Sequence, residues 1–157
     1  MAMQKPWIQR HGHFFLLFAL CVYLLGGVVA CAPSDPAFDA IKQAIQTEDK
    51  DPAATSQVLK DNLGRTKDKN LIPLLLDYLR ETRQHEKFYP DVLGKIAFYL
   101  EQVSEIKSRI HGTIAGPAYL TDKESEADIE QWQTWWDANK DYIYWDGQAQ
   151  ALKVKPH

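Results

Sequence analysis

Five acidic side chains alternate along a short stretch, a spacing that could hold a calcium ion. They are Asp122, Glu124, Glu126, Asp128 and Glu130. A helix–loop–helix calcium site needs Gly at the sixth position and Glu at the twelfth, but the chain has Ala127 and Gln133 there. Negative charge also stabilises the N-terminus of a helix. We therefore interpret the series as the start of a helix and predict no metal ion.

No other set of residues specifies an enzymatic reaction. Asp77 and Glu81 are four residues apart, but we expect Asp77 to meet solvent at the polar edge of a helix. His85-Glu86 lacks the second His of a zinc-protease helix, and Gly112 and Gly116 are not followed by the Lys-Ser/Thr of a phosphate-binding loop. The sequence therefore predicts no catalytic residues, no cofactor, and a protein that is not an enzyme.

Aromatic side chains are concentrated near the C-terminus. Trp132, Trp135 and Trp136 have the i, i+3, i+4 spacing of residues on one side of a helix. We predict that Trp132 and Trp136 lie in the core, because buried tryptophans contribute several kcal/mol. Trp145, flanked by Tyr142 and Tyr144, is compatible with either a core position or a partner-binding surface.

The N-terminal thirty residues have the pattern of an export signal. Lys5 and Arg10 precede seventeen uncharged residues, 14–30, and the first acidic residue of the chain is Asp35. A basic start, an apolar run and small residues after it are typical of such a signal.

The end of the apolar run is more specific. Val28-Val29-Ala30-Cys31 resembles the bacterial lipobox, in which a diacylglyceryl group is attached to the Cys and a peptidase cuts just before it. The resemblance implies lipid attachment at Cys31 and cleavage between Ala30 and Cys31. Because Ala32 rather than Asp follows the Cys, it also favours the outer membrane over the inner membrane. Multiple acyl chains would give stable anchoring.

Two alternatives to the lipobox stay open. The run of residues 14–30 is at the short end for an uncleaved membrane helix of ~20 residues. An ordinary secretory signal would leave Cys31 as a free thiol. All three interpretations place the rest of the chain outside the cytoplasm, at the cell envelope and facing the periplasm or exterior.

Length and charge limit the remaining chain to a modest domain. The 157 residues carry 18 Lys+Arg and 21 Asp+Glu, a formal net charge of −3. One domain fits this length. Nucleic-acid-binding proteins usually carry a basic excess, so we expect no nucleic acid as a partner.

Helix signals divide the exported part into five or six helices. Asp35-Pro36 and Asp51-Pro52 are helix starts, and Thr121-x-x-Glu124 resembles a capping box. We predict helices after each of these positions, a third helix from Leu71 and a charged connector over residues 80–87. Apolar residues from Leu93 to Ile110 follow a helical period and predict one long helix there. We expect Leu75, Leu79, Ile96 and Leu100 in the core. No segment shows sustained strand alternation, so the sequence predicts an all-α fold.

Two segments resemble bacterial HEAT-like repeat proteins. Residues 71–79 form a Leu/Pro-rich stretch like the first helix of such a repeat, and residues 132–139 match a closing W-x-x-W-W-x-x-N helix. Leu63-Gly64 recurs as Leu93-Gly94, thirty residues later. The Arg usually found early in the second helix of each repeat is not evident. The resemblance implies a short stack of antiparallel helical hairpins that offers a binding surface rather than a reaction.

These observations predict a signal peptide over residues 1–30, a tether over 31–35, a HEAT-like domain over 36–145 and a flexible tail over 146–157. The predicted role is a lipid-anchored protein-interaction or scaffolding module that holds an envelope protein. One alternative is a periplasmic ligand-binding or enzymatic domain. A pocket lined by Trp145, Tyr142 and Tyr119 with convergent carboxylates would favour it. Another is an uncleaved membrane-anchored subunit of a larger complex.

Overall fold

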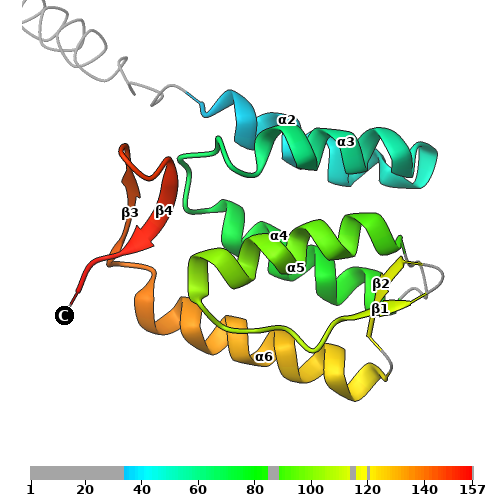
Figure 1. Ribbon diagram of the computed structural model, residues 1–157. Helices are drawn as coiled ribbons and strands as arrows, with labels where there is room; N and C mark the ends of the chain where they lie inside the picture. The colour runs from blue at the N-terminus through cyan, green and yellow to red at the C-terminus, as the bar shows by residue number, and fades with distance from the viewer. Residues whose placement is uncertain (1–33, 85–88, 114–115, 120, 157) are drawn as a thin grey trace, which may run out of the picture. The chain divides into compact units, whose positions relative to one another are not determined.

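The computed structural model in Figure 1 describes residues 34–84, 89–113, 116–119 and 121–156. This part of the chain is mostly helical and carries two small antiparallel hairpins. None of the helices within these ranges is long and apolar enough to cross a membrane. The predicted signal, cleavage and lipid-attachment positions lie outside the described residues.

The first two helices begin where the sequence predicts. Helix α2 spans Pro36–Thr47, and the Asp35 carboxylate accepts hydrogen bonds from the backbone N–H groups of Ala37 and Phe38. A short 3₁₀ turn, η1 (Glu48–Lys50), leads into α3 (Pro52–Asn62), where the Asp51 side chain caps the N–H of Ala54. In both helices the capping carboxylate satisfies a backbone donor that has no partner within the helix.

Helix α4 spans Leu71–Gln84, so the predicted connector over 80–87 begins too early. Polar side chains at this end are bonded within the helix or to a neighbour. Thr82 Oγ1 donates to the carbonyl of Tyr78, and the Arg80 guanidinium bonds Asp77 and Gln133. The polar residues at this end of α4 can therefore continue the helix, because their side chains form hydrogen bonds outside the core.

Helix α5 spans Pro90–Ser104 and ends well before the predicted Ile110. Ser104 Oγ donates to the Leu100 carbonyl and accepts from the N–H of Ile106, and Glu105 has a left-handed φ of 61°. Side chains that bond nearby backbone compete with helix continuation. Ile106 and Ile110 continue the apolar spacing of the sequence past Ser104, but they lie in a loop and not in the helix. They are apolar because they pack against the core from that loop.

Helix α6 spans Asp122–Asn139 and confirms the capping box. The Thr121 hydroxyl accepts from the Glu124 N–H, and the Glu124 carboxylate accepts from the Thr121 N–H. The acidic residues at its start lie where they offset the helix dipole.

The mostly helical structure agrees broadly with the all-α prediction, and two small hairpins go beyond it. Strand β1 (His111–Thr113) pairs with β2 (Gly116–Ala118), and β3 (Ile143–Asp146) pairs with β4 (Ala151–Val154). The region 146–157, predicted as a flexible tail, therefore includes a paired strand. Asp146 Oδ1 accepts from the N–H groups of Gln148 and Ala149 and closes the turn. Strands of three and four residues are too short to show a clear alternation in sequence.

The helices form layers around one core, as Figure 1 shows, with α2 and α3 on one side, α4 and α5 in the middle and α6 on the other side. Helix α3 packs on α5, α4 packs on α6, and β4 contacts α5. All six residues expected in the core are buried. Their exposed fractions are 0% for Trp132, Leu75 and Ile96, 1% for Leu100, 3% for Leu79 and 8% for Trp136.

Asp35 also connects the start of the domain to its interior. In addition to capping α2, its Oδ2 accepts from the N–H of Lys67 at 2.6 Å and of Asp68 at 3.2 Å. The hydrogen bonds that this carboxylate receives outweigh its partial burial and lower its pKa. Asp35, the last residue of the predicted tether, thus fixes the loop between α3 and α4.

We expect Asp35→Ala to lower the free energy of unfolding by about 1–2 kcal/mol, because it removes a helix cap and leaves backbone donors unpaired. Urea unfolding of the purified chain measures the change. Asp39→Ala is the matched control, since Asp39 is an exposed carboxylate in the same first turn. Equal losses in the two variants would show that neither the cap nor the contacts to Lys67 and Asp68 stabilise the fold.

Candidate binding pocket between α3, α5 and the β3–β4 hairpin

A pocket of about 320 Å³ opens between α3, α5 and the C-terminal hairpin. Its walls are mainly apolar, and Leu59, Leu63, Val103 and Leu152 contribute to them. Natural ligand sites usually enclose ~300–1,000 Å³ and combine apolar walls with a few polar groups. The pocket therefore has the size and composition of a small-molecule site.

The pocket exists because three elements meet without filling the space between them. Helix α3, which packs on α5, ends at Asn62, and the turn that follows contributes Leu63 and Gly64 to the lining. The hairpin brings β4 against α5 and buries Leu152. A hydrogen bond from the Lys155 N–H to the Tyr142 carbonyl extends the pairing of the two strands.

Two hydroxyl-bearing side chains at the pocket are deeply buried. Thr66 is 0% exposed and Tyr99 is 7% exposed, and both line the pocket. Neither Thr66 Oγ1 nor the Tyr99 hydroxyl has a hydrogen-bond partner among the described residues. A buried polar atom without a partner costs ~1–3 kcal/mol, and such atoms in native proteins usually have a specific explanation.

Burial raises the pKa of Tyr99, and the nearby Asp35 carboxylate raises it further. The phenol is therefore a neutral hydrogen-bond donor at physiological pH. The Asp35 carboxylate also places a negative charge near the Tyr99 hydroxyl. This charge disfavours the binding of an anionic ligand group beside that hydroxyl.

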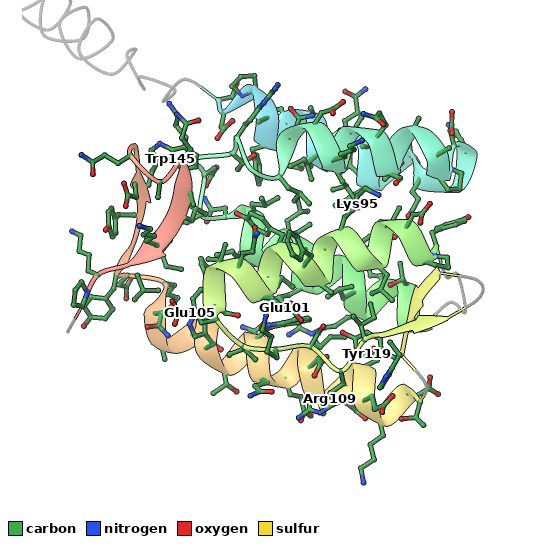
Figure 2. The ribbon with its side chains drawn as sticks, viewed as in Figure 1. Lys95, Glu101, Glu105, Arg109, Tyr119 and Trp145 are labelled. Atoms are coloured by element: carbon green, nitrogen blue, oxygen red, sulfur yellow. The ribbon has the colours of Figure 1, made fainter. Side chains whose placement is uncertain are left out.

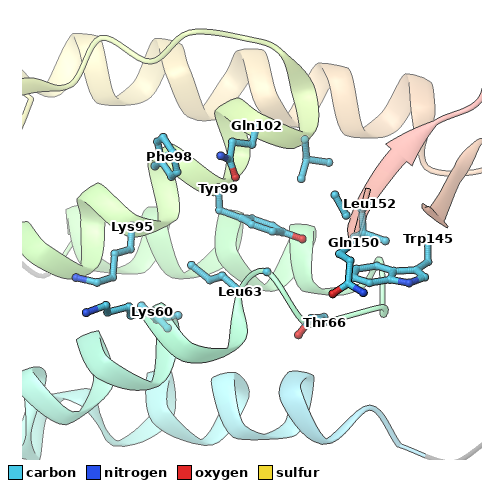
Figure 3. A pocket seen from close by; sticks show the side chains of 14 residues that line it. Lys60, Leu63, Thr66, Lys95, Phe98, Tyr99, Gln102, Trp145, Gln150 and Leu152 are labelled. Carbon is cyan, nitrogen blue, oxygen red and sulfur yellow. The ribbon is translucent and has the colours of Figure 1, made fainter. Parts of the chain in front are cut away.

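Two lysines line the opposite end of the pocket, as Figure 3 shows for Lys60 from α3 and Lys95 from α5. Lys95 Nζ donates to Ser56 Oγ at 2.8 Å and to the Asp91 carbonyl at 3.4 Å. Within the described ranges, no carboxylate lies within 4.0 Å of either ammonium group. Among the described residues that line it, this end of the pocket therefore carries the charge of two lysines.

The three aromatic residues considered for a partner surface are separated by the structure. Trp145 is half-buried, lines the pocket and has the Lys67 ammonium 5.8 Å from its ring centroid. Tyr142 and Tyr144 are exposed, at 45% and 38%. Neither Tyr142 nor Tyr119 lines the pocket, and among the described residues no carboxylate does.

A second polar cluster joins α5, α6 and the loop between them (Figure 2). Asp128 is 1% exposed and accepts from the Arg109 N–H at 2.6 Å and from the Arg109 guanidinium. Glu101 accepts from the N–H and Oγ of Ser108, at 2.8 and 2.7 Å. Burial raises the pKa of Glu101, but the Ser108 hydrogen bonds and Lys107 lower it by more. Because the carboxylates are engaged by these donors, we interpret the cluster as a structural link.

Tyr119 belongs to this cluster. Burial and the Asp128 carboxylate raise the pKa of its hydroxyl, so it is protonated at neutral pH. Across the described ranges, no group of three or more His, Cys, Asp or Glu side chains is arranged to hold a metal ion. The acidic series that begins α6 is part of a helix, as expected, but its member Asp128 is buried rather than solvated.

Alkaline titration tests the environments of Tyr99 and Tyr119. Both have a pKa raised above the ordinary value of about 10. The folded chain therefore retains protons that the unfolded chain releases, and stability present below about pH 10 is lost as the pH rises further. The absorbance of tyrosinate measures how many tyrosines have ionised. Because Tyr99 and Tyr119 stay protonated near pH 10, we expect the double variant Tyr99→Phe/Tyr119→Phe to give the same absorbance change as the parent protein in that range. A loss of amplitude in that range would show that these hydroxyls ionise normally.

Sequence reasoning missed most of the pocket. Lys95, Phe98, Tyr99 and Gln102 have i, i+3, i+4 and i+7 spacing on α5, and this signal was available. It does not reveal that Phe98 is 60% exposed while Tyr99 is buried. Thr66 lies in a loop, and Gln150 and Leu152 come from the unpredicted hairpin, so no local pattern brings them together.

Comparisons with protein-family models, curated proteins and solved structures found no match to this chain.

Proposed function

We propose that this chain is a bacterial lipoprotein, anchored at the cell envelope through a lipid on Cys31. The support is the order of a basic start, an uncharged run over residues 14–30 and a small residue before the Cys. Removal of residues 1–30 would leave Cys31 three residues before Ser34, where the described domain begins. The tether is therefore short, and it holds the domain close to the membrane surface. The residue after Cys31 favours the outer membrane.

We further propose that the helical domain is a protein-binding module with a HEAT-like arrangement. The layering of α2–α3, α4–α5 and α6 agrees with a short helical stack. Such stacks present exposed helix faces and end caps to partners. Fold alone does not specify function, so the binding role depends on the surface that the domain presents.

The observation that carries the binding role is the exposed aromatic surface of the C-terminal hairpin. Tyr142 and Tyr144 project to solvent, and the Lys155 ammonium lies 5.9 Å from the Tyr144 ring centroid. Tyrosines at an exposed edge are frequent anchors of protein interfaces, because a large ring is combined with a polar hydroxyl. The proposed partner is another envelope protein, and no nucleic acid is involved.

Site-specific photocrosslinking in cells tests this proposal. We expect a crosslinking amino acid at Tyr144 to trap a discrete partner band, because the ring would be enclosed by the interface. The same group at Glu130, an exposed position on α6, is the matched control. Equal or absent crosslinking at the two positions would contradict a partner surface on the hairpin.

A second candidate function is the binding of a small ligand in the pocket beside Trp145. The specific observation that favours it is the combination of apolar walls with two buried hydroxyls that have no partner among the described residues. This candidate does not require catalysis. It is compatible with the anchor, since a tethered domain can bind a ligand as well as a protein.

A further inference from the structure

The pocket has a polarity that runs along its length. Lys60 and Lys95 lie at one end in Figure 3, and Trp145 and Gln150 lie at the other, with Tyr99 between them. The lysine end lacks a carboxylate partner within the described residues. The other end lies near Asp35, whose carboxylate receives hydrogen bonds from the loop beside Thr66.

This charge distribution orients a ligand. An anion is attracted to the lysine end and repelled from the Asp35 end, and a hydrogen bond to a charged donor is stronger than one between neutral groups. Between the two ends the walls are mostly apolar, and Phe98 adds an exposed ring at the rim. The body of a bound molecule must therefore be largely apolar, while its charged group lies at the lysine end.

The volume limits the size of the ligand. At about 320 Å³, the pocket is at the small end of the ~300–1,000 Å³ range of natural ligand sites, so it suits a small molecule. The unpartnered hydroxyls of Thr66 and Tyr99 lie among the deeper lining residues.

We propose that this pocket binds a small amphipathic carboxylate, with its carboxylate between Lys60 and Lys95 and its apolar chain along Tyr99 toward Trp145. This proposal rests on the second candidate function, ligand binding in the same pocket, and names the class of ligand; it is separate from the proposed protein-binding surface, which is formed by Tyr142 and Tyr144. It also does not depend on the lipid on Cys31. Failure of either the anchor or the partner surface would leave the site intact.

Fluorine NMR of the full chain, labelled with 5-fluorotryptophan and held in a nonionic detergent, tests the site with decanoate as the probe. We expect the Trp145 signal, assigned with Trp145→Phe, to shift and saturate, while the signal of the fully buried Trp132 stays in place. Decanamide is the matched probe, because it has the same chain length without the charge. We expect it to bind at least about tenfold more weakly.

The lysines are tested with a matched pair of double variants. Lys60→Gln/Lys95→Gln should weaken decanoate binding at least about tenfold, because it removes both cations at the pocket. Lys42→Gln/Lys123→Gln removes two exposed lysines that do not line the pocket and should leave binding unchanged. An unchanged Trp132 signal verifies that each variant is folded. Absence of a Trp145 shift, equal binding of decanoate and decanamide, or equal weakening by both double variants would overturn the proposal.

Discussion

Replacing Trp132 by Ala should lower the free energy of unfolding by about 3–5 kcal/mol and the melting temperature by roughly 10–20 °C. Trp132 is 0% exposed and belongs to the core where α6 packs on α4. Truncation removes the largest fully buried side chain among the described residues and leaves a cavity that the surrounding helices can close only in part. Thermal and urea unfolding, followed by circular dichroism, measure the change.

Two variants make this result interpretable. The Trp132 indole N–H has no hydrogen-bond acceptor among the described residues, so its stabilising effect comes from packing. Trp132→Phe fills most of the space and should cost clearly less than Trp132→Ala. Tyr144→Ala removes an exposed aromatic ring and should change stability little. A melting temperature of Trp132→Ala equal to that of Tyr144→Ala would contradict the core position.

Replacing Cys31 by Ser should abolish lipid attachment, because the serine hydroxyl cannot form the thioether that holds the diacylglyceryl group. Under the lipobox interpretation the variant accumulates as an uncleaved precursor or leaves the membrane fraction. The effect is all-or-none rather than graded. Metabolic labelling with a palmitate analogue, combined with fractionation of the envelope, measures it.

Cys21 provides the matched control for this variant. It is the only other cysteine of the chain and lies within the apolar run rather than at its end. Cys21→Ser should be labelled and fractionate like the parent protein. Normal labelling of Cys31→Ser would contradict lipid attachment at Cys31, and equal loss in both variants would indicate a general effect on export.

Local signals predicted the helix starts well. Asp35-Pro36, Asp51-Pro52 and Thr121-x-x-Glu124 each place a capping side chain next to the first free backbone N–H groups, and the structure uses all three as caps. Capping depends on residues within one turn of each other, so it is visible in the sequence. The buried positions of Trp132 and Trp136 follow in the same way from their spacing on one helix face.

Features that depend on distant residues were not predictable. The apolar period across Ser104 indicated one helix to Ile110, but Arg109 is bonded to Asp128 on α6, nineteen residues later in the chain. The sequence therefore contained no sign that Asp128 bonds Arg109, and Asp128 was interpreted only as part of an acidic helix start. The hairpin β3–β4 is held by short pairing and a Lys153–Asp146 ion pair at 2.7 Å. These interactions leave no periodic signal.

The pocket shows the same limit. Its charged end joins Lys60, in the last turn of α3, and Lys95, on α5, with the whole of α4 between them in the sequence, and its other end comes from the hairpin. The aromatic residues near the C-terminus indicated a site, but the structure divides them. Trp145 faces the pocket, whereas Tyr142 and Tyr144 face solvent. The sequence showed that aromatic residues gather near the C-terminus. Only the tertiary packing shows which of them faces the pocket and which face solvent.

The intact mass of the protein, extracted from its native membrane, tests the proposed anchor most directly. We expect a mass equal to residues 31–157 plus a diacylglyceryl group, with or without an additional N-linked acyl chain. The mass of all 157 residues without lipid would contradict the proposal and indicate a retained N-terminal segment. A cleaved chain without lipid would also contradict it, and would leave Cys31 as a thiol on a protein released from the membrane.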